Sequence, residues 1–506
     1  MRLHLRLGAA ILAAMVVGAV PAAGQKSADT LRIVMRDALP NIDPYYNNLR
    51  TGVVMHHQGW DTLVYRDPIT FKIEPLLATE WKRPDPTTIE FALRPGVKFH
   101  DGSPFTADDV VYTINLVSDP ASRVSTPSNY VWIEKAEKTG ELSVRVKLKR
   151  ATPAALEYFA LVLPIYPKAY REKVGAEGYA KAPIGTGPYK IVKVEPGISI
   201  DFERFEDYWA GSPKGRPAIA KLSVRFVPDA ATEMTELLAG RADWIWNLNP
   251  DQFEPVNRMP HLEAMRKESM RIGYLSLDAG GRTGADNPMT KLKVRQAIFY
   301  AIDRKAIADK LVTGGSRVPL APCVPSQFGC DGELTVYDYN PAKARELLAE
   351  AGYASGFDVE LASYVLPQWG AAVQNYLLAV GIRAKLNQLQ VAALIQRAKA
   401  GELRMHLGSW GSYSINDVAA ILPNFFDGGA DDYARDTDVQ KWLIEGGSSN
   451  DPEVRKKAYS MALQRITEQA YWVPLHTYVT TYGVSRQLDF TPYSDELPRF
   501  YLAKWK

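Results

Sequence analysis

Apolar and polar residues alternate along several short stretches of the chain, which is the pattern of strands that bury one face. Five stretches show it: residues 31–35, 88–93, 142–148, 192–194 and 198–202. The last two flank Pro196-Gly197, a dipeptide suited to the central positions of a type II turn. The pattern therefore predicts strands in these places and a hairpin around Pro196-Gly197.

Helical periods alternate with these strands. One face of the segment 293–312 is apolar and carries Val294, Ala297, Ile298, Ala301 and Ile302. This spacing predicts one helix over 293–312. A second helix is predicted after Asn340, because Asn suits an N-cap, Pro341 suits the first helical position and Gly352 is a stop signal. Such a mixture of elements implies an α/β architecture with several sheets.

The stretch LRPGVKFHDGSPFTADDVVYTINL, residues 93–116, places a His beside an Asp and then two Asp together. Thr106 is a good N-cap, so a helix is predicted from about Ala107. The first turn of this helix holds two of the carboxylates, which favour the positive end of the helix dipole. We therefore interpret four side chains as structural rather than catalytic or metal-binding: His100, Asp101, Asp108 and Asp109.

The chain has 506 residues, and 46% of them are hydrophobic. Length alone favours roughly two to four domains with sizeable cores. Lys and Arg number 60 against 57 Asp and Glu, so the net charge is only +3. Because no long basic run occurs either, nucleic acid and anionic membrane surfaces are poor candidates as partners.

The first residues read as a secretory signal peptide. Arg2 and Arg6 precede or flank an apolar run over 7–20, and PAAGQ supplies small residues for cleavage near Gly24. The run is shorter than the roughly 20 residues that a membrane-spanning helix needs, and no second run of about 18 apolar residues follows. No Cys lies at the cleavage point, so we expect a free periplasmic protein without a lipid anchor.

The chain has two cysteines, Cys323 and Cys330, both within APCVPSQFGC. In an oxidising compartment, a pair separated by a Pro- and Gly-containing turn most simply forms one disulfide. Closing a loop of about eight residues would contribute roughly 2.5 kcal/mol on the chain-entropy description. A redox or metal pair is the weaker interpretation, because the spacing is not CxxC and no second ligand cluster accompanies it.

Patterns that carry catalysis are absent from the sequence: there is no GxSxG, P-loop, HExxH or strand-to-helix GxGxxG. His56 and His57 are adjacent, so their side chains diverge on a regular element. The sequence therefore predicts no catalytic residue, no metal site and no cofactor. Trp and Tyr number 11 and 26 against 16 Phe, which weakly favours a binding cleft.

Six sequence blocks follow one another along the chain. They are LLATEWKRPDPTTIEFALRPGVKFHDGSPFTADDVVYTI, PIGTGPYKI, VRQAIFYAIDRKAI, NPAKARELLAEAGY, RAKAGELRMHLGSW and YWVPLHTYVTTYGVSRQLDFTP. In this order they closely resemble the family 5 extracellular solute-binding proteins, the peptide/nickel/opine group that feeds ABC importers. The resemblance covers nearly the whole chain beyond the signal peptide.

The resemblance implies a bilobed periplasmic binding protein fold, an α/β fold with three discontinuous domains, mixed β-sheets flanked by helices and an interlobe ligand cleft. Its expected borders follow: signal peptide 1–24; domain I of lobe I, 25–65 with 186–268 and 478–506; domain II of lobe I, 66–185; and domain III, which is lobe II, 269–477.

The resemblance also implies a function. The chain would be the periplasmic substrate-binding component of an ABC importer, not an enzyme. It would capture an oligopeptide or a related peptide- or opine-like solute by lobe closure, since closure is selected by differential affinity for the two conformations. It would then deliver the solute to permease subunits in the inner membrane with their ATPase. We expect a monomer that binds no nucleic acid.

The family's charge anchors for peptide termini do not match in this chain. Peptide-binding members resemble one another in an Asp three residues after a Trp, which pairs with the α-ammonium; here Trp410 is followed at that distance by Tyr413. Dipeptide binders use an Arg soon after the VEL strand, and LASYVLPQWGAAVQ has no basic residue. Asp417 would replace the amine anchor, or else cap a helix from Val418.

Candidate ligand-binding residues combine stacking faces, hydroxyls and one carboxylate: Trp410, Ser412, Tyr413, Asp417, Tyr45 and Tyr46. Core packing remains the alternative for the aromatic ones. Because a buried charge without a partner costs several kcal/mol, the cleft should discriminate against short free peptides. It would suit a longer or blocked peptide, or a non-peptide solute that is sugar-like, an opine or a metal chelate.

Two other classes remain open. A periplasmic hydrolase or metalloenzyme would need His56, His100 or Asp101 in a metal site or a nucleophile-base pair. An accessory protein that presents ligand to a sensor would share the binding fold.

Overall fold

The computed structural model describes residues 29–47 and 49–506, except for the side chain of Tyr413. The signal peptide predicted over 1–24 lies outside these residues. In the part of the chain that is described, no helix is both long enough and apolar enough to cross a membrane.

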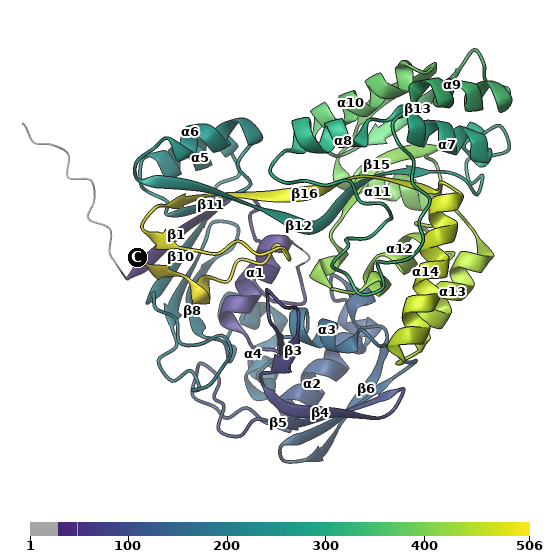
Figure 1. Ribbon diagram of the computed structural model, residues 1–506. Coiled ribbons are helices and arrows are strands. Elements are labelled where there is room, and N and C mark those ends of the chain that lie inside the picture. The colour runs from purple at the N-terminus through teal and green to yellow at the C-terminus, as the bar shows by residue number, and fades with distance from the viewer. Residues whose placement is uncertain (1–28, 48) are drawn as a thin grey trace, which may run out of the picture.

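One large mixed sheet of ten strands extends across the upper part of the molecule in the view of Figure 1. Its strands, in spatial order, are β14 (Ile382–Gln388), β13 (Phe357–Ser363), β15 (Met405–Trp410), β12 (Leu262–Leu277), β16 (Trp472–Ser485), β11 (Trp244–Trp246), β1 (Thr30–Met35), β10 (Lys221–Phe226), β9 (Ser199–Arg204) and β8 (Tyr189–Glu195). The long antiparallel pair of β12 and β16 joins the two ends of the sheet, so we call it the ribbon. The α/β class with mixed sheets and flanking helices is thus confirmed.

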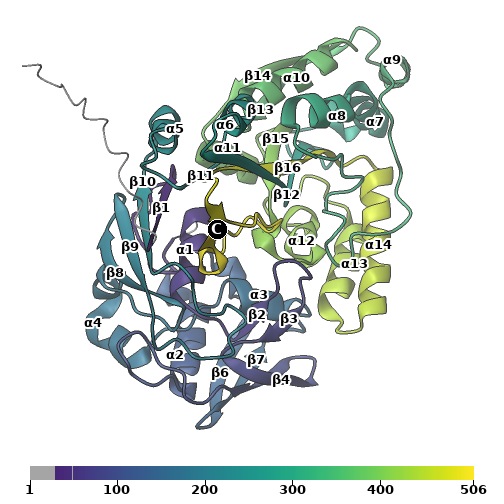
Figure 2. The same cartoon turned by 60° about the vertical axis from the view of Figure 1, so that its left-hand side comes forward.

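A second sheet of four antiparallel strands lies at the opposite side of the molecule from α9 and α10 (Figure 2). Its strands, in spatial order, are β4 (Ala78–Asp85), β5 (Thr88–Leu93), β7 (Ser143–Leu148) and β6 (Ile133–Gly140). Two small ribbons complete the strands: β2 (Val64–Arg66) with β3 (Ile73–Pro75), and β17 (Leu488–Asp489) with β18 (Lys504–Trp505).

The helices cover both ends of the large sheet. Those packed in lobe I are α1 (Arg50–Gly59), α2 (Ala107–Ser118), α3 (Ala155–Leu161), α4 (Lys168–Lys181), α5 (Ala230–Leu238) and α6 (Phe253–Asn257). Those of lobe II are α7 (Leu292–Ala301), α8 (Arg304–Ala306), α9 (Pro341–Glu350), α10 (Pro367–Leu378), α11 (Val391–Ala400), α12 (Leu422–Phe426), α13 (Thr437–Ser448) and α14 (Pro452–Glu468).

Separate hydrophobic cores define the lobes. The core of lobe I gathers β1, α1, α2, the four-stranded sheet and the C-terminal residues near 482–503. Lobe II has one core under α7, α9 and α10 and another under α12 to α14. Ile415 and Ala420, both from lobe II, pack into the core of lobe I, so the lobes are in direct contact. Burial of apolar side chains across this contact stabilises it.

The ribbon contains an irregular step. Glu268 pairs with Val479 and Ile272 pairs with Thr477, so residues 269–271 of β12 stand opposite the single residue Tyr478 of β16. Extra residues of this kind are a β-bulge, which bends a strand and interrupts its ladder. The predicted borders 268/269 and 477/478 fall within this step; the division into three domains stays a prediction.

Local signals placed several elements correctly. β5 spans 88–93, α2 begins at Ala107, and β8 and β9 form the predicted hairpin. Asn340 caps α9 by accepting a bond from the backbone N–H of Lys343 at 3.0 Å. Each of these depends on side-chain periodicity or turn chemistry within about ten residues, which is where sequence patterns are strongest.

The single helix predicted over 293–312 is wrong. α7 ends at Ala301, Asp303 caps the next short helix by accepting from the N–H of Ala306 at 2.8 Å, and a π-helix follows over Ile307–Val312. The apolar period continues across the break, so the pattern could not reveal that an Asp side chain restarts the helix.

The block GTGPYK is a close-packed contact with α1. A Cβ on Gly187 would lie 2.5 Å from the carbonyl carbon of Gly59 and from the nitrogen of Trp60. His100 fixes the same loop: its Nδ1 accepts from the N–H of Gly185 at 3.0 Å, and its Nε2 lies 3.0 Å from the carbonyl of Gly187. The loop can approach α1 this closely because glycine has no side chain.

Candidate functional site

A cavity of about 190 Å³ lies between the lobes. Lobe I contributes Pro44, Asn47, Arg50, Val53, His56, Thr126, Asn129, Tyr130, Leu161 and Val162, and the ribbon and lobe II contribute Arg271, Trp410 and Gly411. The lining mixes apolar walls with a few polar groups, which is the usual make-up of a small-molecule site. A site built from both lobes changes when the lobes move relative to each other.

One part of the wall from lobe I is built by the loop before α1 and by α1 itself. Nδ2 of Asn47 donates to the carbonyl of Asp43 at 2.8 Å and lies 3.3 Å from Nε2 of His56. Burial lowers the pKa of His56 to about 3, so this imidazole is neutral at physiological pH. α1 begins beside the cavity with no side-chain cap and no acidic residue in its first turn, which leaves the positive end of its dipole uncompensated there.

Two cations border the cavity. Arg271 lies in the bulge of β12 and donates through Nε and Nη2 to the two carboxylate oxygens of Glu496, at 3.1 and 3.0 Å. Arg50 lies at the start of α1, with its Nη2 3.4 Å from Glu496. The hydroxyl of Ser269 also donates to Glu496 at 2.8 Å. Burial raises the pKa of this carboxyl, but the charges of Arg271 and Arg50 outweigh it and bring the pKa to about 2.

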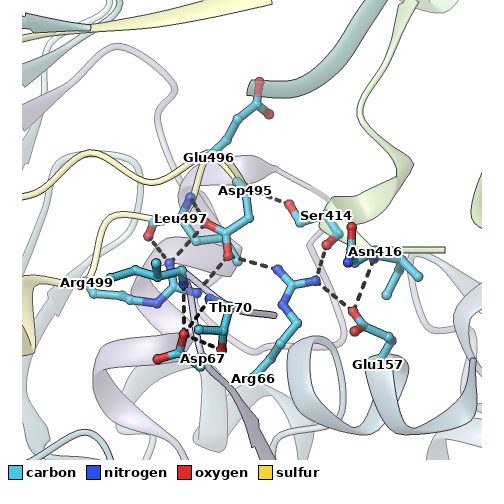
Figure 3. Close-up of polar contacts among 12 residues, drawn as sticks. Arg66, Asp67, Thr70, Glu157, Ser414, Asn416, Asp495, Glu496, Leu497 and Arg499 are labelled. Carbon is cyan, nitrogen blue, oxygen red and sulfur yellow. Dashed lines mark hydrogen bonds and ion pairs between the residues drawn. The ribbon is translucent and has the colours of Figure 1, made fainter. Parts of the chain in front are cut away.

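A buried ion network lies next to this group and connects the lobes (Figure 3). Arg66, at the end of β2, has a fully buried side chain and donates to Glu157 of α3 at 2.7 Å and to Asp495 at 2.8 Å. It also donates to the backbone carbonyl of Ser414, which belongs to lobe II. Asp495 also accepts two bonds from Arg499, at 3.0 and 2.7 Å.

Further bonds join the lobes beside Arg66. The backbone N–H of Asn416 donates to Glu157 at 3.2 Å. The hydroxyl of Ser414 accepts from Nη1 of Arg50 at 2.7 Å and donates to the backbone carbonyl of Asp495 at 2.5 Å. Charged hydrogen bonds in a buried site are strong only while every partner stays in place, so this network depends on the contact between the lobes.

The segments that carry these contacts have strained backbone. Ser412, Ser414 and Glu496 adopt φ of 49°, 66° and 59°, in the left-handed region that side chains other than glycine disfavour. Each such residue costs about 1–3 kcal/mol and persists only where its surroundings hold it. Strained residues cluster at ligand clamps and switch regions, so their grouping beside the cavity supports a functional role for this place.

Of the predicted ligand-binding residues, Trp410 lines the cavity. It ends β15, donates through Nε1 to the carbonyl of Ala420 at 3.2 Å, and packs edge-on against Phe425. Tyr45 is buried in the core of lobe I, where its hydroxyl donates to the carbonyl of Pro164 at 2.5 Å. Tyr46 is half-buried and donates to the carbonyl of Ser122 at 3.1 Å.

The other three predicted residues follow Trp410 in the chain. Ser412 is buried, and its hydroxyl has no hydrogen-bond partner among the described residues. Tyr413 lies in a short 3-10 helix over Ser412–Ser414, but its side chain lies outside the described part. Asp417 is buried and caps the 3-10 helix Val418–Ala420, accepting from the N–H of Ala419 at 2.9 Å.

Asp417 also has a strong partner inside lobe II. Nη2 of Arg455, in α14, donates to both of its carboxylate oxygens at 2.8 and 2.7 Å. A ligand ammonium would have to compete with this guanidinium, so the structure supports the capping interpretation for Asp417. Contact of Asp417 or Tyr413 with a ligand stays a prediction.

The disulfide is present in the structure, with Cys323 and Cys330 joined at 2.04 Å. Its loop holds the segment after Trp410: the N–H of Phe328 donates to the carbonyl of Asn416 at 3.1 Å, and the carbonyl of Phe328 accepts from the N–H of Val418 at 3.1 Å. The loop therefore braces the side of lobe II that faces the ion network.

The candidates for an enzyme site have local partners: His56 lies beside Asn47, His100 binds the loop of Gly185 and Gly187, and Asp101 accepts from the N–H and hydroxyl of Ser103 at 2.9 and 2.6 Å. Asp109 accepts from the backbone N–H and the hydroxyl of Thr106 at 2.8 and 2.9 Å, and Asp108 pairs with Lys138 at 2.8 Å. The described residues contain no cluster of three or more His, Cys, Asp or Glu that could hold a metal ion. Burial lowers the pKa of four histidines to about 3 or 4: His56, His100, His406 and His476.

Sequence reasoning missed Arg50, Arg271 and Glu496. The local sequence offers no signal for them, because Arg50 starts an ordinary helix and Arg271 stands in an irregular part of a long strand. Their contacts join positions more than 200 residues apart, so only the tertiary fold brings them together.

Comparison with known proteins gives one family throughout. The model of the family described as bacterial extracellular solute-binding proteins, family 5 (middle region), matches residues 72–432. Heme-binding protein A of Haemophilus influenzae is 27% identical over 454 residues, or 81% of each chain. Glutathione-binding protein GsiB of Escherichia coli strain K12 is 27% identical over 455 residues, or 86% of each chain.

A solved structure agrees with these relatives. HbpA2 from Haemophilus parasuis superposes with a TM-score of 0.80 at 25% sequence identity, and the match covers 94% of this chain and 100% of that one.

Proposed function

Because the chain belongs to the family 5 bacterial extracellular solute-binding proteins, we propose that it is the periplasmic solute-capturing component of an ABC importer. It is not an enzyme: it closes its lobes around a solute and presents the closed form to permease subunits that work with an ATPase. It acts as a monomer. Closure around a solute needs no chemistry, only a higher affinity of the closed state for the ligand.

The observation that carries this proposal is the cavity lined from both lobes. Arg50 and Asn129 come from lobe I, Arg271 from the ribbon, and Trp410 and Gly411 from lobe II. A solute in this cavity touches both lobes at once, so its binding energy favours the closed arrangement. The continuous ribbon lets the lobes move apart without separating.

The preferred solute is a peptide-like or opine-like molecule. The relative named for glutathione, a tripeptide, supports a peptide-like ligand. None of the cavity-lining residues in the described part of the chain is acidic, so the α-ammonium of an unblocked short peptide has no partner among them. A peptide with a blocked or substituted amine, or an opine, avoids this cost.

A purified protein taken from its own periplasm, denatured and analysed by mass spectrometry, tests the proposal. We expect released small molecules, and an increase in thermal stability when the same molecules are added back, because a ligand at 100 times its Kd stabilises by about 2.7 kcal/mol. A protein that releases nothing and shows no shift with peptides, opines, glycosides, heme or metal chelates would overturn it.

A further inference from the structure

Two guanidinium groups line the cavity and share one carboxylate that is not among the lining residues, and we propose that this unequal set is the binding point for a carboxylate of the solute. The inference rests on the proposed function and specifies the chemistry of its ligand. Arg271 holds both oxygens of Glu496 at 3.1 and 3.0 Å. Arg50 shares the same counter-ion at 3.4 Å. One negative charge therefore faces two positive charges.

The surrounding groups do not supply the missing negative charge. None of the described residues that line the cavity is acidic. Asp495, the carboxylate next in the chain to Glu496, is already shared by Arg66 and Arg499. A carboxylate that enters the cavity gains two cations, whereas an ammonium meets two like charges.

The geometry leaves donor atoms available on the cavity side. Among the described residues, no hydrogen bond engages Nη1 of Arg271. Gly411 keeps the adjoining space open, because a Cβ there would lie 3.0 Å from Nη2 of Arg271 and 3.5 Å from Nη2 of Arg50. The two guanidiniums therefore border one point of the wall, and guanidinium geometry matches a planar carboxylate.

The electrostatics of the two arginines agree with this arrangement. Burial lowers the pKa of Arg50, and the neighbouring charge of Arg271 lowers it further against the opposing effect of Glu496. A second anion beside Arg50 and Arg271 would relieve both the desolvation of Arg50 and the repulsion between the two cations.

The anchor also connects the ligand to lobe contact. Arg50 belongs to lobe I and Arg271 to the ribbon, while Nη1 of Arg50 donates to the hydroxyl of Ser414 in lobe II at 2.7 Å. A carboxylate held by both guanidiniums therefore binds groups that meet only when the lobes touch. The acidic group of the solute, rather than its apolar part, therefore determines which solutes stabilise the closed state.

Binding of matched peptide pairs tests the anchor. The probes are N-acetylated di- to pentapeptides with a free C-terminal carboxylate and the same peptides as C-terminal amides, titrated calorimetrically into wild type and variants. We expect wild type to prefer the acid by at least about 30-fold, since an unpaired buried charge costs 2 kcal/mol or more. Arg271→Gln should remove most of that preference, measured as the ratio of the Kd of the amide to the Kd of the acid.

Two further variants distinguish a loss of the carboxylate-binding point from a general loss of folded structure. Gly411→Ala keeps every charge and has an ordinary backbone conformation, but crowds Nη2 of Arg271; it should reduce the acid preference while the melting temperature stays within a few degrees. Arg383→Gln removes an exposed guanidinium paired with Asp358 and should change neither acid nor amide binding.

Equal binding of acid and amide by wild type would overturn the anchor and leave the proposed function intact. If no peptide binds, the probe becomes the solute released by denaturation: an acidic solute that Arg271→Gln no longer holds supports the anchor, and an uncharged one overturns it. A protein that binds and releases nothing fails both proposals.

Discussion

Replacing Arg66 by Met should destabilise the folded protein by about 3–4 kcal/mol. The Met side chain fills part of the space but donates no hydrogen bond. Arg66 is fully buried and donates to Glu157, Asp495 and the carbonyl of Ser414 (Figure 3). Asp495 keeps Arg499, so the main loss falls on Glu157, whose side chain is only 14% exposed and retains one bond from a backbone N–H. Removal of one partner from a buried ion pair typically costs 3–5 kcal/mol.

The measurement is urea unfolding at pH 7.5 in protein freed of solute, followed by tryptophan fluorescence and circular dichroism together, so that coincident curves show a single transition. Arg383→Met is the matched control, because its partner Asp358 is 79% exposed and such surface pairs contribute at most about 1 kcal/mol. In the double variant Arg66→Met/Glu157→Gln the unpaired charge is gone, so part of the loss should be recovered. A cost for Arg66→Met no larger than that of the control would refute the reasoning.

Four other predictions follow from the structure. The free energy of unfolding should fall as the pH drops below 6.5, by up to about 1.4 kcal/mol per pH unit for each buried histidine. The reason is that histidines of the unfolded chain bind protons in this range, whereas the buried imidazoles, with pKa of about 3 or 4, stay neutral. Urea midpoints that stay constant from pH 7 to 5 would contradict this. Between about pH 4.5 and 2, protonation of Glu496 should add to the loss, since its pKa is lowered on folding to about 2. Gly187→Ala should lower the free energy of unfolding by about 3 kcal/mol or more, because the added Cβ would lie 2.5 Å from backbone atoms. Gly447→Ala, with open space around the added Cβ, should be neutral or mildly stabilising. Similar melting temperatures of the two variants would argue against a rigid loop contact. Cys323→Ser/Cys330→Ser should cost about 2.5 kcal/mol, and a reducing agent should lower the melting temperature of wild type but not of this variant.

Elements that depend on nearby residues could be predicted from the sequence. Thr106 and Asp109 form a capping box within four residues, and the hairpin turn at Pro196-Gly197 is likewise local. The break after Ala301 was missed because the apolar face continues through it while one Asp side chain restarts the helix. An apolar periodicity predicts a helix, but it does not show where a polar side chain within the segment ends one helix and begins another.

The candidate site was predictable only in part. The resemblance to the family pointed to Trp410, which does line the cavity. For Asp417 the sequence left two interpretations, an amine anchor or a helix N-cap, and the structure shows the cap. Arg455, which pairs with this carboxylate, lies 38 residues further along and could not be inferred from spacing. Arg271 and Glu496 are separated by 225 residues, and nothing in either local sequence distinguishes them from surface charges.

The position of Arg271 in the bulge of the ribbon has a mechanical consequence. A bulge interrupts the ladder and bends the strand, so we expect the lobes to rotate about this point of the ribbon. Points near a pivot travel little, whereas points far along either arm travel a long way. A pivot in the bulge predicts that Arg271 and the adjoining Trp410 move little when the molecule opens, while Arg50 and Asn129 move away from them. We therefore expect the contact of the solute with Arg271, next to the pivot, to be the last one that breaks when the solute leaves.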